Sequence, residues 1–331
     1  MLSTREIHQH LTNVLEDTAF LGFPGLIRGK VRDRYDLGDK LVLITTDRQS
    51  AFDRVLAAVP FKGQVLNQVS AFWFEHTRDI VPNHVIEVPD PNVTIARKCE
   101  VFPVEFVMRS YMTGTTSTSI WKNYESGARS YCGHELPDGM VKNQPLPKPL
   151  LTPTTKDDLH DELVSAAQVV ERGLIDADTW ARLEAITGAL FARGQQIAAA
   201  NGLILVDTKY EMGRDADGNI VLIDEIHTPD SSRYWLREGY ESRFANREEP
   251  ENIDKEFLRR WFVDHCDPYH DEVLPAAPAE LVAELSHRYI QLFEMITGTL
   301  FEPALDRPIP ERMSGNLAKY REECQRVARR R

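Results

Sequence analysis

The chain has 331 residues, 42% of them hydrophobic and 27% charged, which is typical of a soluble globular protein large enough for more than one structural unit. Its formal net charge of −12 argues against binding to duplex nucleic acid, because such binders usually carry a basic face. No apolar run reaches the ~20 residues of a membrane helix, no secretory pattern opens the chain, and the four cysteines form no Cys-x-x-Cys pair, so we expect a cytoplasmic protein without a membrane partner.

The first third of the chain is predicted to be rich in strands. Ser3 and Glu6 fit a capping box, which predicts a short opening helix. Residues 26–47 read as a hairpin with its turn at 37–40, and residues 65–80 show the apolar spacing of a helix. Three more strands are predicted, and Pro and Asn separate them: 84–88, 93–101 and 104–112.

The rest of the chain alternates and then becomes helical. Residues 144–155 carry four prolines and are predicted to form an extended connector. A helix is predicted over residues 178–200, with Gly202 as its stop, and a hairpin over residues 202–227. Helices predominate after Asn252. This order indicates an α+β fold, with a strand-rich beginning, a mixed middle and a helical end.

Three charged residues alternate along the first strand of the 202–227 hairpin. Side chains point to opposite faces of a strand in turn, so Asp207, Lys209 and Glu211 are predicted to share one face. Asp224 follows the second, apolar strand, and Gly218 closes the turn between the two strands.

The register of this hairpin decides what its charged face meets. Pairing Arg214 with Asn219, or shifting that pairing by two residues, places the charged face against Ile220, Leu222 and Asp224. Carboxylates on a partly apolar face need a partner, which is either a structural ion-pair network or Mg²⁺ bridged to phosphate. The hairpin by itself leaves both interpretations open.

Two basic or polar segments precede this hairpin. Gly29 is followed by Lys30 and Arg32 on one strand face, which suits a triphosphate as in the glycine-rich loop of kinases, although this stretch alone favours a solvated basic strand. There is no Walker A motif. The loop after the next strand holds Ser50 and Asp53, and it is either a functional loop or a tight turn.

Two arginines are candidates for binding an anion. Arg109 ends a predicted strand and precedes the hydroxyl-rich loop 113–119, which leads into a predicted helix near Trp121. Asp230 or Ser231 is predicted to cap a second helix, with Arg233 in its first turn. A cation there opposes the helix dipole unless an anion lies nearby, which favours Arg233 as a ligand-binding residue.

Taken together, these segments resemble the SAICAR synthetase (phosphoribosylaminoimidazole-succinocarboxamide synthase) family. The motifs are GKVRDRYDLGDKLVLITTDRQSAFDR, FPVEFVMRSYMTGTTSTSIW, LTPTTK, LILVDTKYEMG and IDEIHTPDSSRYW, in this order from about Ile27 to Trp235. The tail with PENIDKEFLRRWF and LPAAPAELVAELSHRYI resembles the longer form of the family. Several ordered motifs are much more specific than any one of them.

The resemblance implies an ATP- and Mg²⁺-dependent ligase. Such an enzyme joins the carboxylate of carboxyaminoimidazole ribonucleotide (CAIR) to the amine of L-aspartate, giving SAICAR, ADP and phosphate through an acyl phosphate. It also implies three domains: residues 1–112 for the nucleotide, 113–250 for the metal and substrate hairpin, and a helical region 251–331. Monomer and homodimer both stay open.

The resemblance also implies roles for single residues. The ATP-binding residues would be Gly29, Lys30, Arg32, Glu105 and Lys209. Glu211 and Asp224 would hold the metal and, with Lys209, form the catalytic set. The substrate-binding residues would be Ser50, Asp53, Arg109, Thr115, Ser117, Asp230, Ser231 and Arg233.

This chain departs from the shorter members of the family in the loop after Arg109. The loop reads TGTTSTSIW where a compact Gly-Ser stands in those members, so Thr115, Ser117 and Ser119 all stay open as the contact to the substrate phosphate.

Two alternative functions can be compared with the sequence. A small-molecule kinase would need a His-Arg-Asp catalytic loop, which the sequence lacks, and a non-catalytic nucleotide-binding regulator would not need both Glu211 and Asp224.

Overall fold

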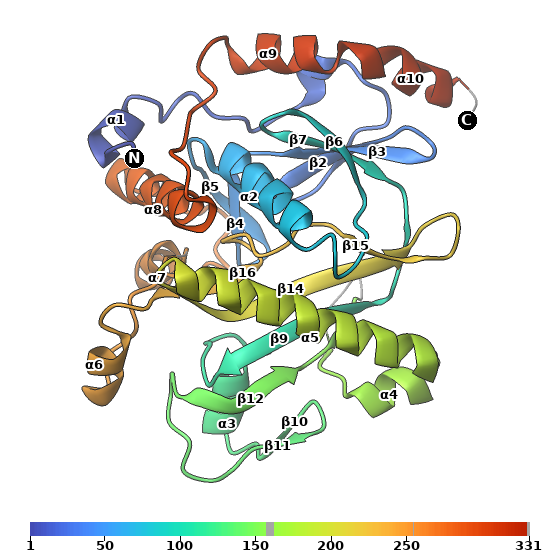
Figure 1. Ribbon diagram of the computed structural model, residues 1–331. Coiled ribbons are helices and arrows are strands. Elements are labelled where there is room, and N and C mark those ends of the chain that lie inside the picture. The colour runs from blue at the N-terminus through green and yellow to red at the C-terminus, as the bar shows by residue number, and fades with distance from the viewer. Residues whose placement is uncertain (157–161, 254, 330–331) are drawn as a thin grey trace. The chain divides into compact units, whose positions relative to one another are not determined.

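The computed structural model describes residues 1–156, 162–253 and 255–329. Two compact units form: unit 1 comprises Met1–Glu75, His84–Lys98 and Asp254–Arg331, and unit 2 comprises His76–Asn83 and Cys99–Ile253. Helices combine with antiparallel sheets in the described residues, which confirms the predicted α+β class (Figure 1). The three functional domains predicted from the sequence stay a prediction.

Unit 1 contains a five-stranded antiparallel sheet in the order β1-β2-β3-β7-β6. Its strands are β1 Ile27–Arg28, β2 Arg32–Asp36, β3 Lys40–Thr45, β6 Val85–Asp90 and β7 Val93–Arg97. The predicted turn between β2 and β3 is confirmed, because Leu37 N–H donates to the Lys40 carbonyl (2.9 Å) and Gly38 has a φ of 97°. A separate hairpin follows, made of β4 Arg48–Ala51 and β5 Arg54–Ala58.

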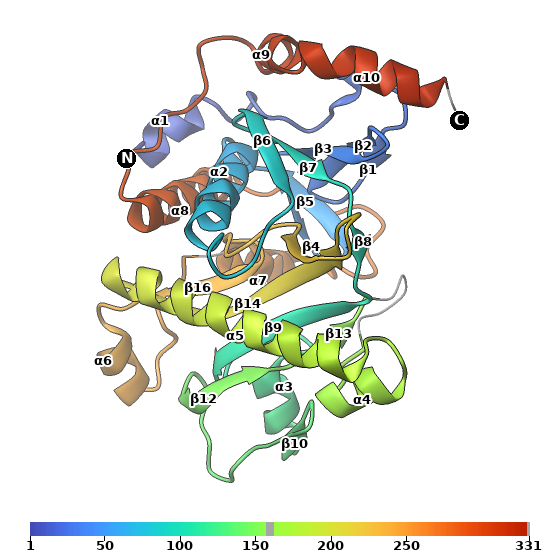
Figure 2. The same cartoon turned by 45° about the vertical axis from the view of Figure 1, so that its right-hand side comes forward.

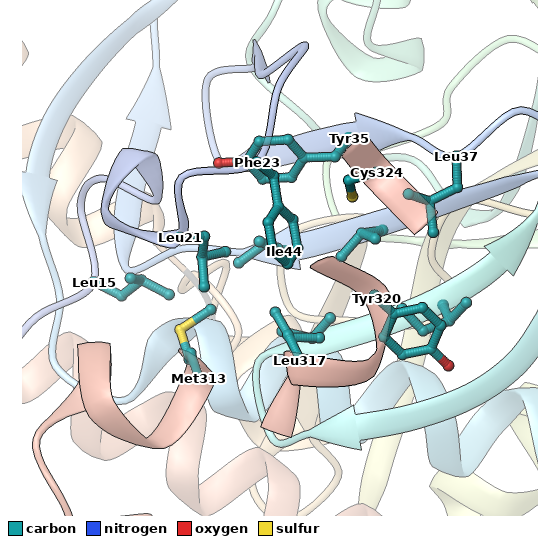
Figure 3. Packing of buried hydrophobic residues seen from close by; sticks show 13 residues of the cluster. Leu15, Leu21, Phe23, Tyr35, Leu37, Ile44, Met313, Leu317, Tyr320 and Cys324 are labelled. Atoms are coloured by element: carbon teal, nitrogen blue, oxygen red, sulfur yellow. The ribbon is translucent and has the colours of Figure 1, made fainter. Parts of the chain in front are cut away.

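Helices of unit 1 come from both ends of the chain. They are α1 Thr4–His8, the 3-10 turn η1 Ala19–Leu21, α2 Lys62–His76, α7 Glu256–His265, α8 Ala279–Thr297, α9 Ile309–Asn316 and α10 Ala318–Ala328. The predicted capping box of α1 is confirmed, with both Ser3–Glu6 bonds formed. Figure 3 shows Met313 and Leu317, from the C-terminal helices, in one buried cluster with Ile44 of β3 and Tyr35 of β2.

Unit 2 is organised around one long strand, β14. Its sheet consists of β8 Glu100–Val101, β9 Val104–Tyr111, β12 Pro145–Leu151, β13 Thr154–Thr155, β14 Leu203–Arg214, β15 Ile220–Ile223 and β16 Ser232–Leu236. β9 and β16 both pair with Asp207 and Thr208 of β14. A small hairpin, β10 Ser130–Tyr131 with β11 His134–Glu135, lies outside this sheet.

The proline-rich segment 144–155 is not the connector predicted from its sequence. It forms β12 and β13, and both strands pair with β9. Prolines are tolerated in an edge strand, where a missing N–H breaks no ladder bond on the open side. The register with β9 shifts between Pro145 and Leu150, so Pro147 and Pro149 lie in an irregular part of the strand, where prolines are also tolerated.

Four helices belong to unit 2: α3 Ile120–Glu125, α4 Ala166–Glu171, α5 Ala177–Ala200 and α6 Tyr240–Ala245. The long α5 lies along β14 and β9 (Figures 1 and 2). Asp176 caps its start, and Gly202, with a φ of 74°, follows its end, which confirms the predicted helix and its stop. No helix among the described residues is long and apolar enough to cross a membrane.

Candidate active site

The predicted alternation along β14 is confirmed. Val206, Thr208, Tyr210 and Met212 are buried, whereas Asp207 and Lys209 on the other face are partly exposed. Glu211 shares the face of Lys209 and is 8% exposed. One face of the sheet therefore belongs to the core, and the opposite face presents a row of charges at its boundary with solvent.

The predicted register of the hairpin is wrong by one residue. Glu211 pairs with Ile223 and Arg214 with Ile220, so the charged face meets Val221 and Ile223 instead of Ile220 and Leu222. A shift of one residue exchanges the faces of the second strand. The exchange of faces does not apply to Asp224, because this residue lies beyond the end of β15. Its backbone is in the left-handed region, with a φ of 65°.

Lys209 is the centre of a cluster of opposite charges. Its Nζ donates to Glu105 Oε1 (2.7 Å) and to Glu211 Oε1 (2.8 Å). Burial lowers the pKa of the Lys209 ammonium, but the carboxylates of Glu211, Glu105 and Asp224 outweigh burial and raise that pKa above its ordinary value. Four predicted site residues, Glu105, Lys209, Glu211 and Asp224, thus interact electrostatically, and Lys209 stays charged.

Lys156 is a member of this cluster that the sequence analysis did not assign. Its Nζ forms an ion pair with Glu211 Oε2, so two lysines hold the two oxygens of one carboxylate. Lys156 closes the LTPTTK motif, which was recognised without a role for its lysine. The missing signal was spatial: β13, just before Lys156, pairs with β9 beside Glu105.

The donor set can be tested for its fit to Mg²⁺. Among the residues that the structure describes, no three His, Cys, Asp or Glu side chains converge as a metal site. Glu211 and Asp224, the pair that was predicted to share Mg²⁺, both act electrostatically on Lys209. Mg²⁺ is typically held by one or two carboxylates together with phosphate oxygens and water, so this pair fits it.

A second charged set lies next to Lys209 along the same face. Asp207 is paired with Arg109 of β9 on one side and with Arg233 of β16 on the other. Its Oδ2 lies 2.9 Å from Nη1 of Arg233 and 3.8 Å from Nη1 of Arg109. Asp207 therefore holds the two arginines, and the interpretation from the sequence that Asp207 supports Lys209 is wrong.

Arg109 is held by further bonds. Its Nε donates to the Thr152 hydroxyl (2.9 Å), and its Nη2 donates to the Thr118 carbonyl (3.2 Å). The Arg109 side chain is 10% exposed. A guanidinium fixed in this way presents a defined direction to an anion, which a mobile surface arginine does not.

The loop 113–119 reaches Arg233. A Cβ placed on Gly114 would lie 3.7 Å from Nη1 of Arg233, and Gly114 has a φ of 101°. Ser119 is already engaged, because its Oγ bonds the Thr116 N–H (3.1 Å) and lies 2.7 Å from the Thr116 hydroxyl. The exposed side chains of Thr115 and Ser117 make no hydrogen bond within the described parts of the chain, so the structure favours these two over Ser119 as ligand contacts.

The segment after Asp224 is not helical where a helix was predicted. Asp230 and Ser231 instead form a tight turn, in which their N–H groups donate to the Thr228 hydroxyl (3.3 and 3.2 Å). Arg233 lies on strand β16, so the argument from a helix dipole does not apply to it. Hydroxyl side chains stabilise turns by the same local bonds that cap helices, which explains the error.

The other predicted site residues belong to unit 1. Gly29 and Lys30 lie in the turn between β1 and β2, and Arg32 begins β2. A Cβ on Gly29 would lie 2.7 Å from the Arg32 carbonyl oxygen. Lys30 forms an ion pair with Asp53. Because both side chains are exposed, by 55% and 87%, the pair contributes little to stability and leaves both groups available.

Ser50 and Asp53 lie on the β4–β5 hairpin. Ser50 pairs with Val55 and Ala51 with Arg54, so Phe52 and Asp53 form a two-residue loop. Their φ values of 54° and 59° give the left-handed geometry that such hairpin loops require. The loop is therefore a tight turn, as one of the two predictions had it, and it still places Asp53 beside Lys30.

His227 lies buried between α5 and the core-facing side of β14, opposite the charged face. Its Nε2 is 2.5 Å from the Tyr210 hydroxyl, and a Cβ on Gly194 of α5 would lie 2.4 Å from its Cε1. Burial lowers the pKa of His227 to about 3, so the imidazole is neutral at pH 7. These contacts are those of a structural histidine, which is the role that the sequence favours for His227.

The depressed pKa of His227 predicts how stability depends on pH. The unfolded chain binds a proton near the ordinary pKa of ~6.5, but the folded chain does not, so the free energy of unfolding falls as pH falls from about 6.5 toward 3. Between pH 7 and pH 5 this group alone should remove about 2 kcal/mol. Denaturant unfolding of wild type and His227→Gln at both pH values checks this: the variant should lose less stability on acidification, and equal losses would contradict the assignment.

Comparison with known proteins shows what this chain resembles. The SAICAR synthetase family model matches residues 25–276. A Legionella pneumophila (strain Paris) protein named phosphoribosylaminoimidazole-succinocarboxamide synthase is 59% identical over 301 residues, which cover 91% of this chain and 96% of the relative.

Solved structures give the same answer. SAICAR synthase from Saccharomyces cerevisiae, complexed with SAICAR, has a TM-score of 0.72 and 30% identity, and the match covers 84% of this chain and 96% of the yeast chain. A type-2 SAICAR synthetase in complex with ADP has a TM-score of 0.64 and 26% identity, covering 84% of this chain and all (100%) of the other.

Proposed function

Because the chain belongs to the SAICAR synthetase family, it is an ATP-dependent ligase of purine biosynthesis, and we propose which residues and substrates carry that activity. The family match does not favour the alternative of a small-molecule kinase. The observation that carries the proposal is the charged face of β14, where Lys209 bonds Glu105 and Glu211 with Asp224 close by.

The proposed substrates are CAIR and L-aspartate. A carboxylate is a poor acyl donor, so a CAIR carboxylate oxygen first takes the γ-phosphoryl group of ATP, and ADP leaves. The aspartate amine then attacks the carbonyl carbon, a C–N bond forms, phosphate departs and the amine loses its proton. Catalysis of this kind depends mostly on positioning and on stabilising charge.

Lys209 and the acids around it are the proposed catalytic set. Lys209 stays cationic and is held by Glu105 and Glu211, so it can place a fixed positive charge beside transferring phosphate. Glu211 and Asp224 would hold Mg²⁺. When bound, that ion would neutralise phosphate charge. Lys156 forms an ion pair with the second Glu211 oxygen.

The arginine set is proposed to bind the anionic groups of CAIR. Asp207 orients Arg233, while Thr152 and the Thr118 carbonyl orient Arg109. Two preoriented guanidinium groups suit a phosphate or a carboxylate. Thr115 and Ser117 are the proposed hydroxyl contacts, and Asp230 and Ser231 keep their predicted part in substrate binding.

Unit 1 is proposed to contribute nucleotide-binding residues. Gly29, Lys30 and Arg32 are proposed to face ATP phosphates, and Ser50 and Asp53 are proposed to bind either aspartate or the nucleotide.

The four cysteines, Cys99, Cys132, Cys266 and Cys324, are free thiols, in keeping with a proposed cytoplasmic location. Whether the active species is a monomer or a homodimer stays open.

ADP release tests the proposed substrates. The purified protein should release ADP from ATP and Mg²⁺ quickly only when CAIR and L-aspartate are both present, because the acyl phosphate has no acceptor without the amine. The assay omits CAIR, aspartate or Mg²⁺ in turn. ADP release at the full rate without aspartate would contradict the proposed ligase reaction.

A further inference from the structure

Arg48 is a buried arginine to which none of the roles above applies. It starts β4 in unit 1, its side chain is 7% exposed, and its Nη2 lies 2.6 Å from Oδ1 of the fully buried Asp33. Asp33 also accepts a hydrogen bond from the Thr18 hydroxyl (2.7 Å). Burying an ion pair costs desolvation energy, so pairs of this kind are weak evidence for a purely stabilising role.

The guanidinium group of Arg48 binds two carbonyls of the turn that precedes β2. Its Nε donates to the Lys30 carbonyl (3.0 Å) and its Nη2 to the Gly29 carbonyl (3.0 Å), while Nη1 donates to the Glu16 carbonyl. The next carbonyl, that of Val31, accepts from the Thr46 N–H (3.0 Å) and the Thr46 hydroxyl (2.7 Å). Three successive carbonyls are therefore bound by two neighbouring residues.

This pattern sets the direction of the backbone N–H groups. In a trans peptide unit the C=O and the following N–H point in opposite directions. When the carbonyls of Gly29 and Lys30 point to Arg48, the N–H groups of Lys30 and Val31 point away from it. Neither N–H group has an acceptor within residues 1–156, 162–253 and 255–329.

We propose that Arg48 is a positioning residue for the nucleotide phosphates. By binding the carbonyls of Gly29 and Lys30, it turns the N–H groups of Lys30 and Val31 outward as donors for phosphate oxygens, next to the Lys30 ammonium. Successive backbone N–H groups that point the same way form an anion-binding concavity. This inference rests on the proposed role of the Gly29–Arg32 turn in ATP binding, and it adds the element that orients the turn.

Inhibition by ADP and by adenosine tests this role. Arg48→Lys keeps the charge beside Asp33 but cannot form the fork to both carbonyls. We expect it to raise the inhibition constant of ADP and the KM for ATP at least about tenfold, as lost charge-assisted bonds predict, with little change in the inhibition constant of adenosine or the KM for aspartate. A purely structural role would weaken ADP and adenosine binding alike, and that result would overturn the proposal.

Two further variants keep the test decisive. Thr46→Val removes the hydroxyl bond to the Val31 carbonyl (2.7 Å) and the long contact from the Arg48 N–H (3.4 Å), and it preserves side-chain shape. It should raise the ADP constant by a smaller factor of about 3, and it serves if Arg48→Lys does not fold. Arg34→Lys changes an exposed arginine of β2, the strand that follows the Gly29–Arg32 turn, and should leave both constants unchanged. Unaltered ADP binding in both Arg48→Lys and Thr46→Val would overturn the proposal.

Lys30→Ala separates the inference from the function on which it rests. If this change raises the KM for ATP but Arg48→Lys does not, the turn binds phosphate and Arg48 does not position it. If neither Lys30→Ala nor Arg48→Lys alters nucleotide binding, the proposed role of the turn is itself wrong.

Discussion

Replacing Glu211 by Gln, or Asp224 by Asn, should lower the turnover number of the ligase at least about 100-fold, in line with the loss of a charge-stabilising group at a reaction centre. Both changes keep the shape of the side chain and remove its negative charge. Glu211 is nearly buried and bonds two lysines, so its neutral variant also leaves Lys156 and Lys209 with excess positive charge. The measurement is steady-state ADP release at saturating ATP, CAIR and aspartate.

A control on the same hairpin distinguishes this effect from general damage. Asp217 lies exposed at the tip of the β14–β15 turn, so Asp217→Asn removes the same charge from the same hairpin and should keep wild-type turnover. Thermal unfolding of each variant checks that the fold is intact. Near-normal turnover in both Glu211→Gln and Asp224→Asn would contradict the catalytic role and would indicate that the cluster is a structural ion-pair network.

Replacing Arg233 by Ala should raise the KM for CAIR about 10- to 100-fold, because hydrogen bonds to charged groups contribute ~1.5–3 kcal/mol and each 1.4 kcal/mol is a factor of ten. Turnover at saturating CAIR should fall much less. The reason is geometric: Asp207 holds Nη1 of Arg233 at 2.9 Å, so the guanidinium is preoriented for its ligand. Initial rates at varied CAIR give the two constants separately.

Two other variants sharpen this test. Arg233→Lys keeps the charge without the planar fork and should give an intermediate KM for CAIR. Arg237→Ala removes an exposed arginine just after β16, whose one described side-chain bond is a long contact to the Ala199 carbonyl (3.5 Å), and should change nothing. If the Arg233→Ala enzyme had the wild-type KM for CAIR, Arg233 would not be a CAIR-binding residue.

Local periodicity predicted much of the fold and of the charged face. Residues 203–214 form the strand that period-two alternation indicated, and its odd-numbered charges share a face. The capping box at Ser3 and the stop at Gly202 also follow from short-range chemistry, which a sequence displays directly.

The sequence did not predict how the strands pair with one another. The register between β14 and β15 differs by one residue from each of the two predicted registers. The turn chemistry of residues 215–218 allowed more than one pairing, so it did not decide between them. The partners of Asp207 were also missed. They are Arg109 and Arg233, which come from two other strands. Contacts of this kind depend on tertiary pairing, which no local pattern encodes.

Polar turn residues caused the other error at the site. Thr228, Asp230 and Ser231 make bonds that suit a helix cap or a turn equally, and the chain continues into β16 because Arg233 and its neighbours pair with β14. Tertiary pairing thus overrode a local preference. Lys156 and Arg48 were missed because their importance lies in what they contact far along the chain.

Binding of Mn²⁺ with ADP, followed by electron paramagnetic resonance, tests most directly whether Glu211 and Asp224 hold the metal of the nucleotide. Mn²⁺ prefers the same oxygen ligands as Mg²⁺ and reports binding without turnover. The wild-type enzyme should bind the Mn²⁺–ADP complex at least about tenfold more tightly than Glu211→Gln or Asp224→Asn, a difference of about 1.4 kcal/mol, while Asp217→Asn matches wild type. Equal dissociation constants for wild type and both cluster variants would contradict the metal site.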